Sequence, residues 1–285
     1  MNEQRIAIIT DSGTDVPAAF VAAHDVRVIP LRINYSDGST YESGVDITPE
    51  EVVTRFDEEV PTTSLPSPLR VREAFEQAQR DGYVAAVAVT ISSGLSATFE
   101  TVGMVARQME GFPVVMVDTK SIGVAAGLVV MEAVRQIEAG MPLERIGSVL
   151  SAVSERVRVF FSVQKLDFLR KGGRISEAVY RVGSVLNIKP VLTCDAREGK
   201  YVIEKKPRGW QKALRAQVDL IAEQAERWGQ VRLAVCTYDP ELRGELEARL
   251  RERVGNAVEL ISCSISPDLL VHTGPTLVGM AVMGM

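Results

Sequence analysis

The chain has 285 residues and a formal net charge of -5, and 46% of its residues are hydrophobic while 24% are charged. This composition is that of a folded globular protein, and it excludes a disordered chain because there is ample apolar surface to bury. The 37 acidic and 32 basic residues form no long run of either sign, so we expect no nucleic-acid partner.

The amino terminus and the cysteines indicate the compartment. The opening MNEQRIAIITDSGTD reaches an acidic residue after one short apolar run, which is too brief for a signal peptide, and no stretch approaches the ~20 apolar residues of a membrane span. Cys194, Cys236 and Cys263 are widely spaced among apolar or small neighbours, which favours buried thiols over a disulfide framework or a zinc site. We therefore expect a cytoplasmic protein with no bound metal.

The first half of the chain alternates short apolar runs with amphipathic segments. A capping box at Thr48 to Glu51 predicts one helix start, and the prolines of VPTTSLPSP predict irregular backbone before the next helix. This alternation predicts a parallel sheet covered by helices. The predicted strands are 5–10, 26–33, 83–91 and 113–117, and the predicted helices are 16–23, a segment after 48, 71–80, a segment from about 98, and 124–138.

Polar loops follow three of these strands: DSGTD, SSGLS and DTKS. The carboxyl ends of parallel strands meet at one edge of a sheet, where ligands of open α/β sheets bind. We therefore expect the three loops to lie close together.

The pattern changes after about residue 155. The segment Ala196 to Gly199 reads as a hairpin turn between strands 190–193 and 201–205, and a hairpin requires antiparallel pairing. Further strands at 157–163, 231–237, 257–263 and 278–283, with helices at 210–227 and 240–252, predict a mixed sheet backed by helices. A chain of this length tends to divide into two domains, so we predict an α/β fold of two domains, 1–155 and 156–285.

Only two histidines are available for chemistry. His24 ends a predicted helix and is expected at the surface, whereas His272 lies in a small-residue loop before the last strand. A serine hydrolase or acyl transferase using Ser96 and His272 is one possibility, although SSGLS matches neither G-x-S-x-G nor S-x-x-K. A phosphate- or nucleotide-binding module is another, although no G-x-x-x-x-G-K-[ST] loop is present.

Two hydroxyl-rich segments indicate a simpler function, which is anion binding. Side-chain hydroxyls and free N–H groups at the start of a helix hold anions, and both the segment Thr62 to Ser64 and the segment Ser92 to Thr98 fit this description. The same residues would also serve purely as helix caps. Spacing alone leaves both interpretations open.

The motifs, taken together and in order, resemble the DegV family over nearly the whole chain. Each motif is short, but seven of them in the family's order make the resemblance specific. They are TDSGTD at 10–15, TSLPSP at 63–68, ISSGLSAT at 91–98, VDTKS at 117–121, KGGRIS at 171–176, NIKP at 187–190 and HTG at 272–274.

The resemblance implies a function that needs no nucleophile. Members of the family are fatty acid-binding proteins with two α/β domains, and the resemblance implies a ligand between the domains, with its carboxylate at a polar end and its chain in an apolar pocket. In some bacteria they present the acid to a separate fatty acid kinase. By motif, Thr63 and Ser96 are implied to bind the carboxylate, with His272 and Arg174 close by, while Arg208 is implied to face the kinase.

The resemblance thus implies a lipid-binding protein with a long-chain fatty acid such as palmitate as its ligand, no cofactor and no catalytic residue of its own. Two positions depart from the family's usual pattern. Leu65 replaces a glutamine, which changes the polarity at the pocket mouth, and Ala97 replaces a glycine, which is tolerated provided that φ there is not positive.

Overall fold

The computed structural model describes residues 2–184 and 187–285. Its first sheet has four parallel strands in the order β2-β1-β6-β7. Both β1 and β6 are buried along their whole length, as expected for strands covered on both faces. The strands are β1 (Ile6–Asp11), β2 (Arg27–Ile29), β6 (Ala85–Thr90) and β7 (Val114–Asp118).

The second large sheet is mixed and has the order β10-β9-β8-β13-β11-β12. Neighbouring strands are antiparallel except β11 and β12, which run parallel. The predicted hairpin forms β9 and β10, so the mixed sheet predicted for the second half is confirmed. The strands are β8 (Val157–Ser162), β9 (Val191–Cys194), β10 (Tyr201–Lys205), β11 (Val231–Thr237), β12 (Ala257–Cys263) and β13 (Val278–Gly284).

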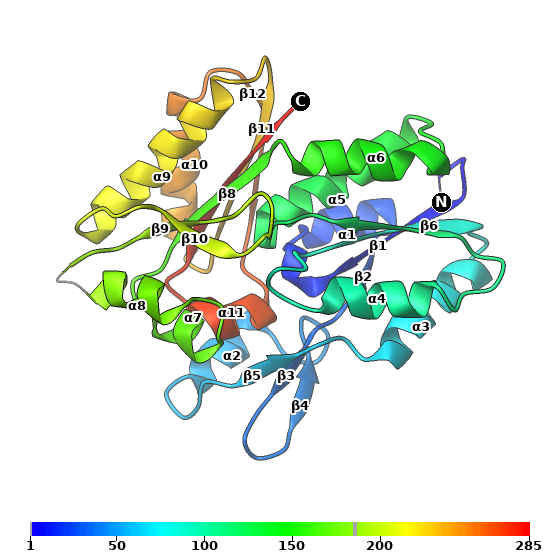
Figure 1. The fold of residues 1–285 in the computed structure, drawn as a ribbon, viewed down its shortest axis with the longest axis horizontal. Helices are drawn as coiled ribbons and strands as arrows, with labels where there is room; N and C mark the ends of the chain where they lie inside the picture. The colour runs from blue at the N-terminus through cyan, green and yellow to red at the C-terminus, as the bar shows by residue number, and fades with distance from the viewer. Residues whose placement is uncertain (1, 185–186) are drawn as a thin grey trace.

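Helices pack against both faces of the parallel sheet and both faces of the mixed sheet (Figure 1). On one side of the parallel sheet lie α3 (Pro68–Arg80) and α4 (Thr98–Ala106), and on the other lie α5 (Gly123–Glu138) and α6 (Leu143–Ser154). The outer face of the mixed sheet is packed against α9 (Trp210–Ala225) and α10 (Pro240–Arg253).

Helix α5 packs against both large sheets. Every residue from Gly123 to Val134 is buried, which agrees with its apolar composition on all sides. The predicted α/β class and the two kinds of sheet are therefore confirmed. The division into domains 1–155 and 156–285 stays a prediction, because α5 joins the two sheets into one apolar core.

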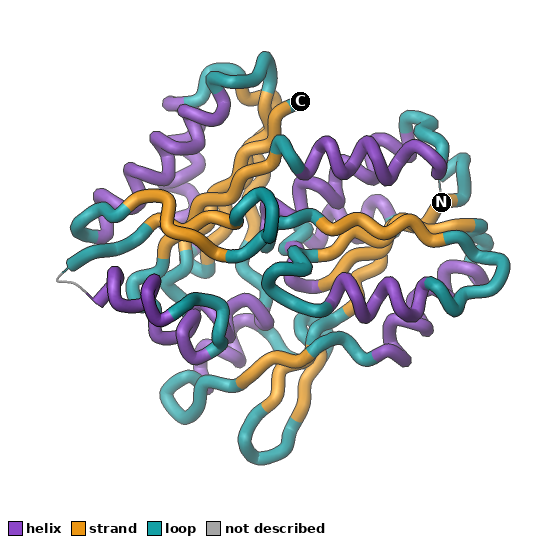
Figure 2. Tube along the Cα trace, viewed as in Figure 1, coloured by secondary structure: helices purple, strands orange, loops and turns teal. Residues whose placement is uncertain are grey.

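A third, small sheet lies below the parallel sheet in Figure 2 and has the order β4-β3-β5. These strands are β3 (Arg32–Asn34), β4 (Thr40–Glu42) and β5 (Thr62–Ser64), and the remaining helices are η1 (Ser12–Thr14), α1 (Ala18–His24), α2 (Pro49–Arg55), α7 (Asp167–Lys171), α8 (Glu177–Ser184) and α11 (Pro267–Thr273).

Three local predictions were wrong, each for a tertiary or backbone reason. The run 26–33 divides around Pro30 into β2 and β3, which belong to different sheets. The segment Thr62 to Ser64 is not irregular, because β5 pairs with β3 between the flanking prolines. His272 lies in helix α11 and not in a loop, since the Pro at the start of that helix favours the first turn and the helix ends at Gly274.

Among the described residues, no helix is both long enough and apolar enough to cross a bilayer.

Candidate functional site

Four residues predicted from separate motifs line one hollow, which we call the polar pocket. Thr63 comes from β5, Ser96 from the loop after β6, Arg174 from the segment after α7, and His272 from α11. The polar pocket spans about 380 Å³ of space between atoms, part of it open to solvent. Its remaining lining residues are Leu31, Ile91, Leu95, Ile122, Tyr201, Asp268 and Leu269.

His272 and Thr63 are in direct contact across this pocket. Nε2 of His272 lies 2.7 Å from Oγ1 of Thr63. Burial, and then the charge of Arg174, lower the pKa of His272 to about 3, so its imidazole is neutral near pH 7. Within the described residues Nδ1 has no hydrogen-bond partner. When Nε2 carries the ring proton and donates to Oγ1 of Thr63, the hydroxyl of Thr63 is left to donate to a ligand oxygen, with a guanidinium nearby.

Two glycines, one in the KGGRIS motif and one in the HTG motif, fix the position of the His272 side chain. A Cβ on Gly172 would lie 2.2 Å from Nδ1 of His272, so the ring packs directly on the backbone of the KGGRIS segment. Gly274 has a φ of 68°, and a Cβ there would lie 2.7 Å from the ring of Phe168. Glycine is required at both positions because any side chain would displace the imidazole or its helix.

The SSGLS loop is held by its neighbours on both sides. Ser93 Oγ donates to Asp118 Oδ2 at 2.5 Å and accepts from Lys120 Nζ at 2.9 Å, so the VDTKS motif fixes the loop. A Cβ on Gly94 would lie 2.0 Å from the carbonyl oxygen of Glu198, in the turn of the β9–β10 hairpin. The three polar loops therefore gather at the strand ends as predicted, and the hairpin closes over one of them.

Ser96 has two contacts at once. Its Oγ lies 2.8 Å from Oγ1 of Thr98 and accepts from the backbone N–H of Thr98 at 3.3 Å. Ser96 therefore holds the first N–H of α4 although Ala97 is the N-cap position, and it also lines the polar pocket; its part in anion binding stays a prediction. Ala97 has a φ of -78°, so the methyl group that replaces the family's glycine causes no backbone strain.

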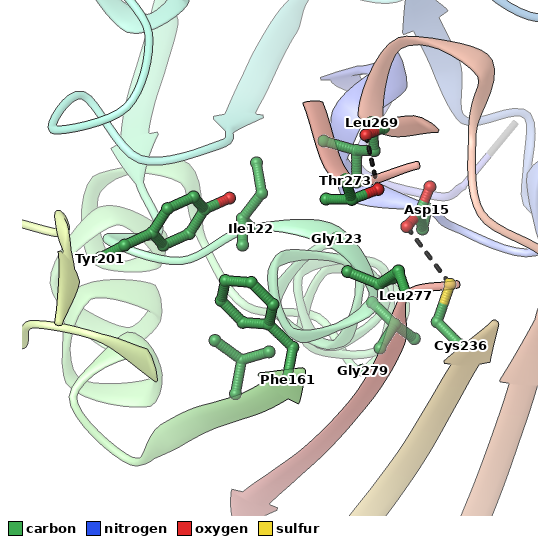
Figure 3. A pocket seen from close by; sticks show the side chains of 12 residues that line it. Asp15, Ile122, Gly123, Phe161, Tyr201, Cys236, Leu269, Thr273, Leu277 and Gly279 are labelled. Atoms are coloured by element: carbon green, nitrogen blue, oxygen red, sulfur yellow. Dashed lines mark hydrogen bonds between the residues drawn. The ribbon is translucent and has the colours of Figure 1, made fainter. Parts of the chain in front are cut away.

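A second hollow, which we call the apolar pocket, adjoins the polar pocket through shared Ile122, Tyr201 and Leu269. It also spans about 380 Å³ of space between atoms, part of it open to solvent. Figure 3 shows Tyr201 and Ile122 at one end and the Asp15–Cys236 pair at the other, with Phe161 between them. The apolar pocket lies between α5 and the mixed sheet. The residues that line it are Asp15, Ile122, Gly123, Val124, Val159, Phe161, Tyr201, Cys236, Leu269, Thr273, Leu277 and Gly279.

Asp15 is a buried acid at the inner end of the apolar pocket. Its Oδ1 accepts from the backbone N–H of Ser266 at 2.9 Å, and its Oδ2 accepts from the thiol of Cys236 at 3.5 Å. Burial, and then the nearby Asp268 carboxylate, raise the pKa of Asp15 to about 7. Burial likewise raises the pKa of Asp11 to about 7.

The residues of the apolar pocket were not predicted from the sequence. Phe161 and Gly279 lie on strands whose apolar residues look like ordinary core, Leu277 directly precedes β13, and Tyr201 gave no signal beyond its place after the hairpin turn. Arg208, predicted to face a partner, is exposed and lines neither pocket. His24, expected at the surface, is partly exposed and lies 2.7 Å from Glu138.

The geometry does not pair the two residues of the hydrolase alternative. His272 Nε2 contacts Thr63, Ser96 contacts Thr98, and no hydrogen bond joins Ser96 to His272 within 2–184 and 187–285. In the same ranges no group of three or more His, Cys, Asp or Glu side chains is placed to hold a metal ion.

Comparison with known proteins agrees with the motifs and the fold. A family model described as an uncharacterised protein of the DegV family matches residues 5–284. A DegV domain-containing protein of Clostridium acetobutylicum is 33% identical over 98% of this chain and 99% of its own length. One of Clostridium perfringens is 32% identical over 98% of each chain.

Solved structures show the same fold. A structure described as fatty acid binding of a DegV family protein from Thermus thermophilus has a TM-score of 0.90 and 30% identity, and the match covers 99% of this chain and 100% of that one. A stearic acid-binding protein from Eubacterium ventriosum has a TM-score of 0.88 and 26% identity over 98% of each chain. With its motifs, its fold and a family match over almost its entire length, this chain belongs to the DegV family.

Proposed function

We propose that this protein binds a long-chain fatty acid such as palmitate, with the carboxylate in the polar pocket and the acyl chain in the apolar pocket. The observation that carries the proposal is the junction of the two pockets at Ile122, Tyr201 and Leu269. A cluster of hydrogen-bonding groups at one end and an apolar space at the other match the two ends of a fatty acid. The related Thermus and Eubacterium proteins are described as fatty acid-binding.

The two pockets contribute differently to binding. Each buried methylene contributes about 0.8 kcal/mol, so the chain supplies most of the affinity. The hydroxyls of Thr63 and Ser96, the imidazole of His272 and the guanidinium of Arg174 provide polar contacts that fix the carboxylate. Hydrogen bonds to a charged group contribute roughly 1.5 to 3 kcal/mol each.

The experiment is to denature the purified protein, extract it and identify acyl chains by mass spectrometry, and then to titrate the delipidated protein with palmitate. We expect stoichiometric recovery of long-chain fatty acid and saturable binding. Hexadecanol, which has a chain of the same length without a carboxylate, should bind more weakly. Absence of any acyl chain, together with no palmitate binding by the folded protein, would refute the proposal.

We also propose that the bound acid is presented to a fatty acid kinase. An outer hollow shares Thr63, Ser96 and Arg174 with the polar pocket and opens it toward the surface, and Leu65 stands at its rim. A carboxylate bound there would lie near the surface, where a partner could reach it. The exposed Arg208, which lines neither pocket, is proposed to contact that partner.

The test uses a fatty acid kinase from the same organism and measures acyl phosphate formed from bound palmitate. Arg208→Ala should slow the reaction at low protein concentration and leave palmitate affinity unchanged, because a charge at an interface rim mainly affects association rate. Arg251→Ala, an exposed charge in α10, is the matched control. Equal rates of acyl phosphate formation for both variants at every protein concentration would show that Arg208 does not contact the kinase.

A further inference from the structure

Two of the three cysteines lie side by side on the mixed sheet. Cys236 of β11 and Cys263 of β12 are direct partners in the parallel register, and both belong to the apolar cluster on the inner face of that sheet. Both are free thiols. Their closeness could not be read from the chain, where 26 residues separate them and no short cysteine motif is present.

The strand geometry allows a bond between them. Neighbouring strands lie about 4.8 Å apart, and Cα atoms joined by a disulfide are usually about 4.4 to 6.8 Å apart. Side chains at paired positions leave the sheet on the same face. In addition, β12 is an edge strand and Cys263 is its last residue, so small shifts there disturb no further strand.

The two thiols differ in access and in surroundings. Cys263 is partly exposed, whereas Cys236 is buried. Cys236 also lines the apolar pocket and donates to Oδ2 of Asp15. The interaction with Cys263, and then burial, raise the pKa of Cys236 well above its usual value. An oxidant would therefore react first at Cys263.

We propose that Cys236 and Cys263 form a reversible disulfide on exposure to a hydroperoxide, and that this bond changes the inner wall of the apolar pocket. The sulfur of Cys263 attacks the peroxide O–O bond, giving a sulfenic acid and water from hydrogen peroxide. The sulfur of Cys236 then attacks the sulfur of Cys263 and a second water leaves, while Asp15 is placed to take the thiol proton. Two thiols and one peroxide thus yield one disulfide and two waters, and a dithiol reductant reverses the bond.

The effect on ligand binding rests on the proposed fatty acid function. The disulfide removes the thiol donor from Asp15 and leaves that carboxyl less satisfied beside the acyl chain. We expect palmitate affinity to fall by roughly threefold to tenfold, the scale of one lost hydrogen bond. Because linkage is reciprocal, bound palmitate should make the disulfide easier to reduce by the same factor.

The primary test is peptide mapping of the wild-type protein after hydrogen peroxide treatment, without reductant. We expect a linked Cys236–Cys263 peptide that separates on treatment with a dithiol, while Cys194, which has no cysteine partner, stays a free thiol. Oxidation of Cys263 to sulfinic acid with Cys236 still free would overturn the disulfide.

The second test compares palmitate affinity of the oxidised and reduced forms, with Cys263→Ser treated identically as the control. A peroxide effect in wild type that is absent from Cys263→Ser supports the coupling, and equal affinity of the mapped disulfide form and the reduced form overturns it. If the reduced protein binds no palmitate, the proposed function fails, and the peptide map alone still decides whether the disulfide forms.

Discussion

The polar pocket and the apolar pocket adjoin but are built from different kinds of residue. Thr63, Ser96, Arg174 and His272 each lie in a short recognisable motif and reach the polar pocket from four separate segments. The apolar pocket is lined largely by strand and helix residues, such as Val159 and Val124, whose neighbours form ordinary core. The residues of a polar site can therefore be recognised in the sequence by their types. An apolar pocket can be recognised only in the folded structure, as a space between side chains.

If the apolar pocket supplies most of the affinity, filling it should have the largest effect. Gly279 lines this pocket, and a Cβ there meets its nearest atoms at 3.9 Å, an ordinary contact distance. In Gly279→Leu the longer side chain would displace three or four methylenes of the ligand, so palmitate affinity should fall by about 100-fold at ~0.8 kcal/mol each.

Isothermal titration calorimetry with delipidated protein measures this loss. Gly279→Ala is the matched control and should bind nearly as wild type, while circular dichroism verifies that both variants fold. Full affinity in a folded Gly279→Leu protein would place the acyl chain elsewhere.

Substitutions in the polar pocket should cause the next largest loss of palmitate affinity. Thr63→Ala combined with Ser96→Ala removes two hydroxyls from the proposed carboxylate site, and palmitate affinity should fall at least roughly tenfold because hydrogen bonds to charged groups are strong. Thr62→Ala changes the exposed neighbour on the same strand and should leave the affinity unaltered. Equal dissociation constants for the double variant and wild type would contradict the assigned carboxylate position.

A smaller loss of palmitate affinity is expected when His272 is displaced by a change in a neighbouring residue. Gly172→Ala introduces a methyl group against the imidazole, so overpacking should cost about 1 to 3 kcal/mol and disturb the Thr63 contact. Palmitate affinity should fall severalfold. In a His272→Ala background the same change should have little effect, since the clash is gone, and an undiminished loss there would show that Gly172 acts through some other contact.

The smallest effect is expected in the pH dependence of stability. Burial raises the pKa of Asp15 to about 7, above the 3.8 of an unperturbed carboxyl, so the unfolded state loses its proton first. The stabilising contribution of this residue is present below about pH 4 and is lost as the pH rises through about 7. Asp15→Asn should therefore reduce the decline in unfolding free energy between pH 5 and pH 8.

Urea denaturation of both proteins at each pH measures this difference. The decline should be reduced and not abolished in the variant, because Asp11 also has a pKa raised to about 7 by burial. Parallel curves for the two proteins would show that Asp15 is ionised in the folded state over the whole range.

The sequence by itself determined the α/β class, the parallel and mixed sheets and the hairpin, because strand and helix periodicities and turn residues are local properties. Through the resemblance to the DegV family it also pointed to Thr63, Ser96, Arg174 and His272, since their motifs are contiguous, and these four line one pocket. Tertiary structure decided that β3 and β5 pair into a third sheet and that His272 lies in a helix. It likewise placed Cys236 beside Cys263, and Tyr201 and Gly279 around one space, because strand register and the packing of α5 between two sheets are not encoded in any single segment.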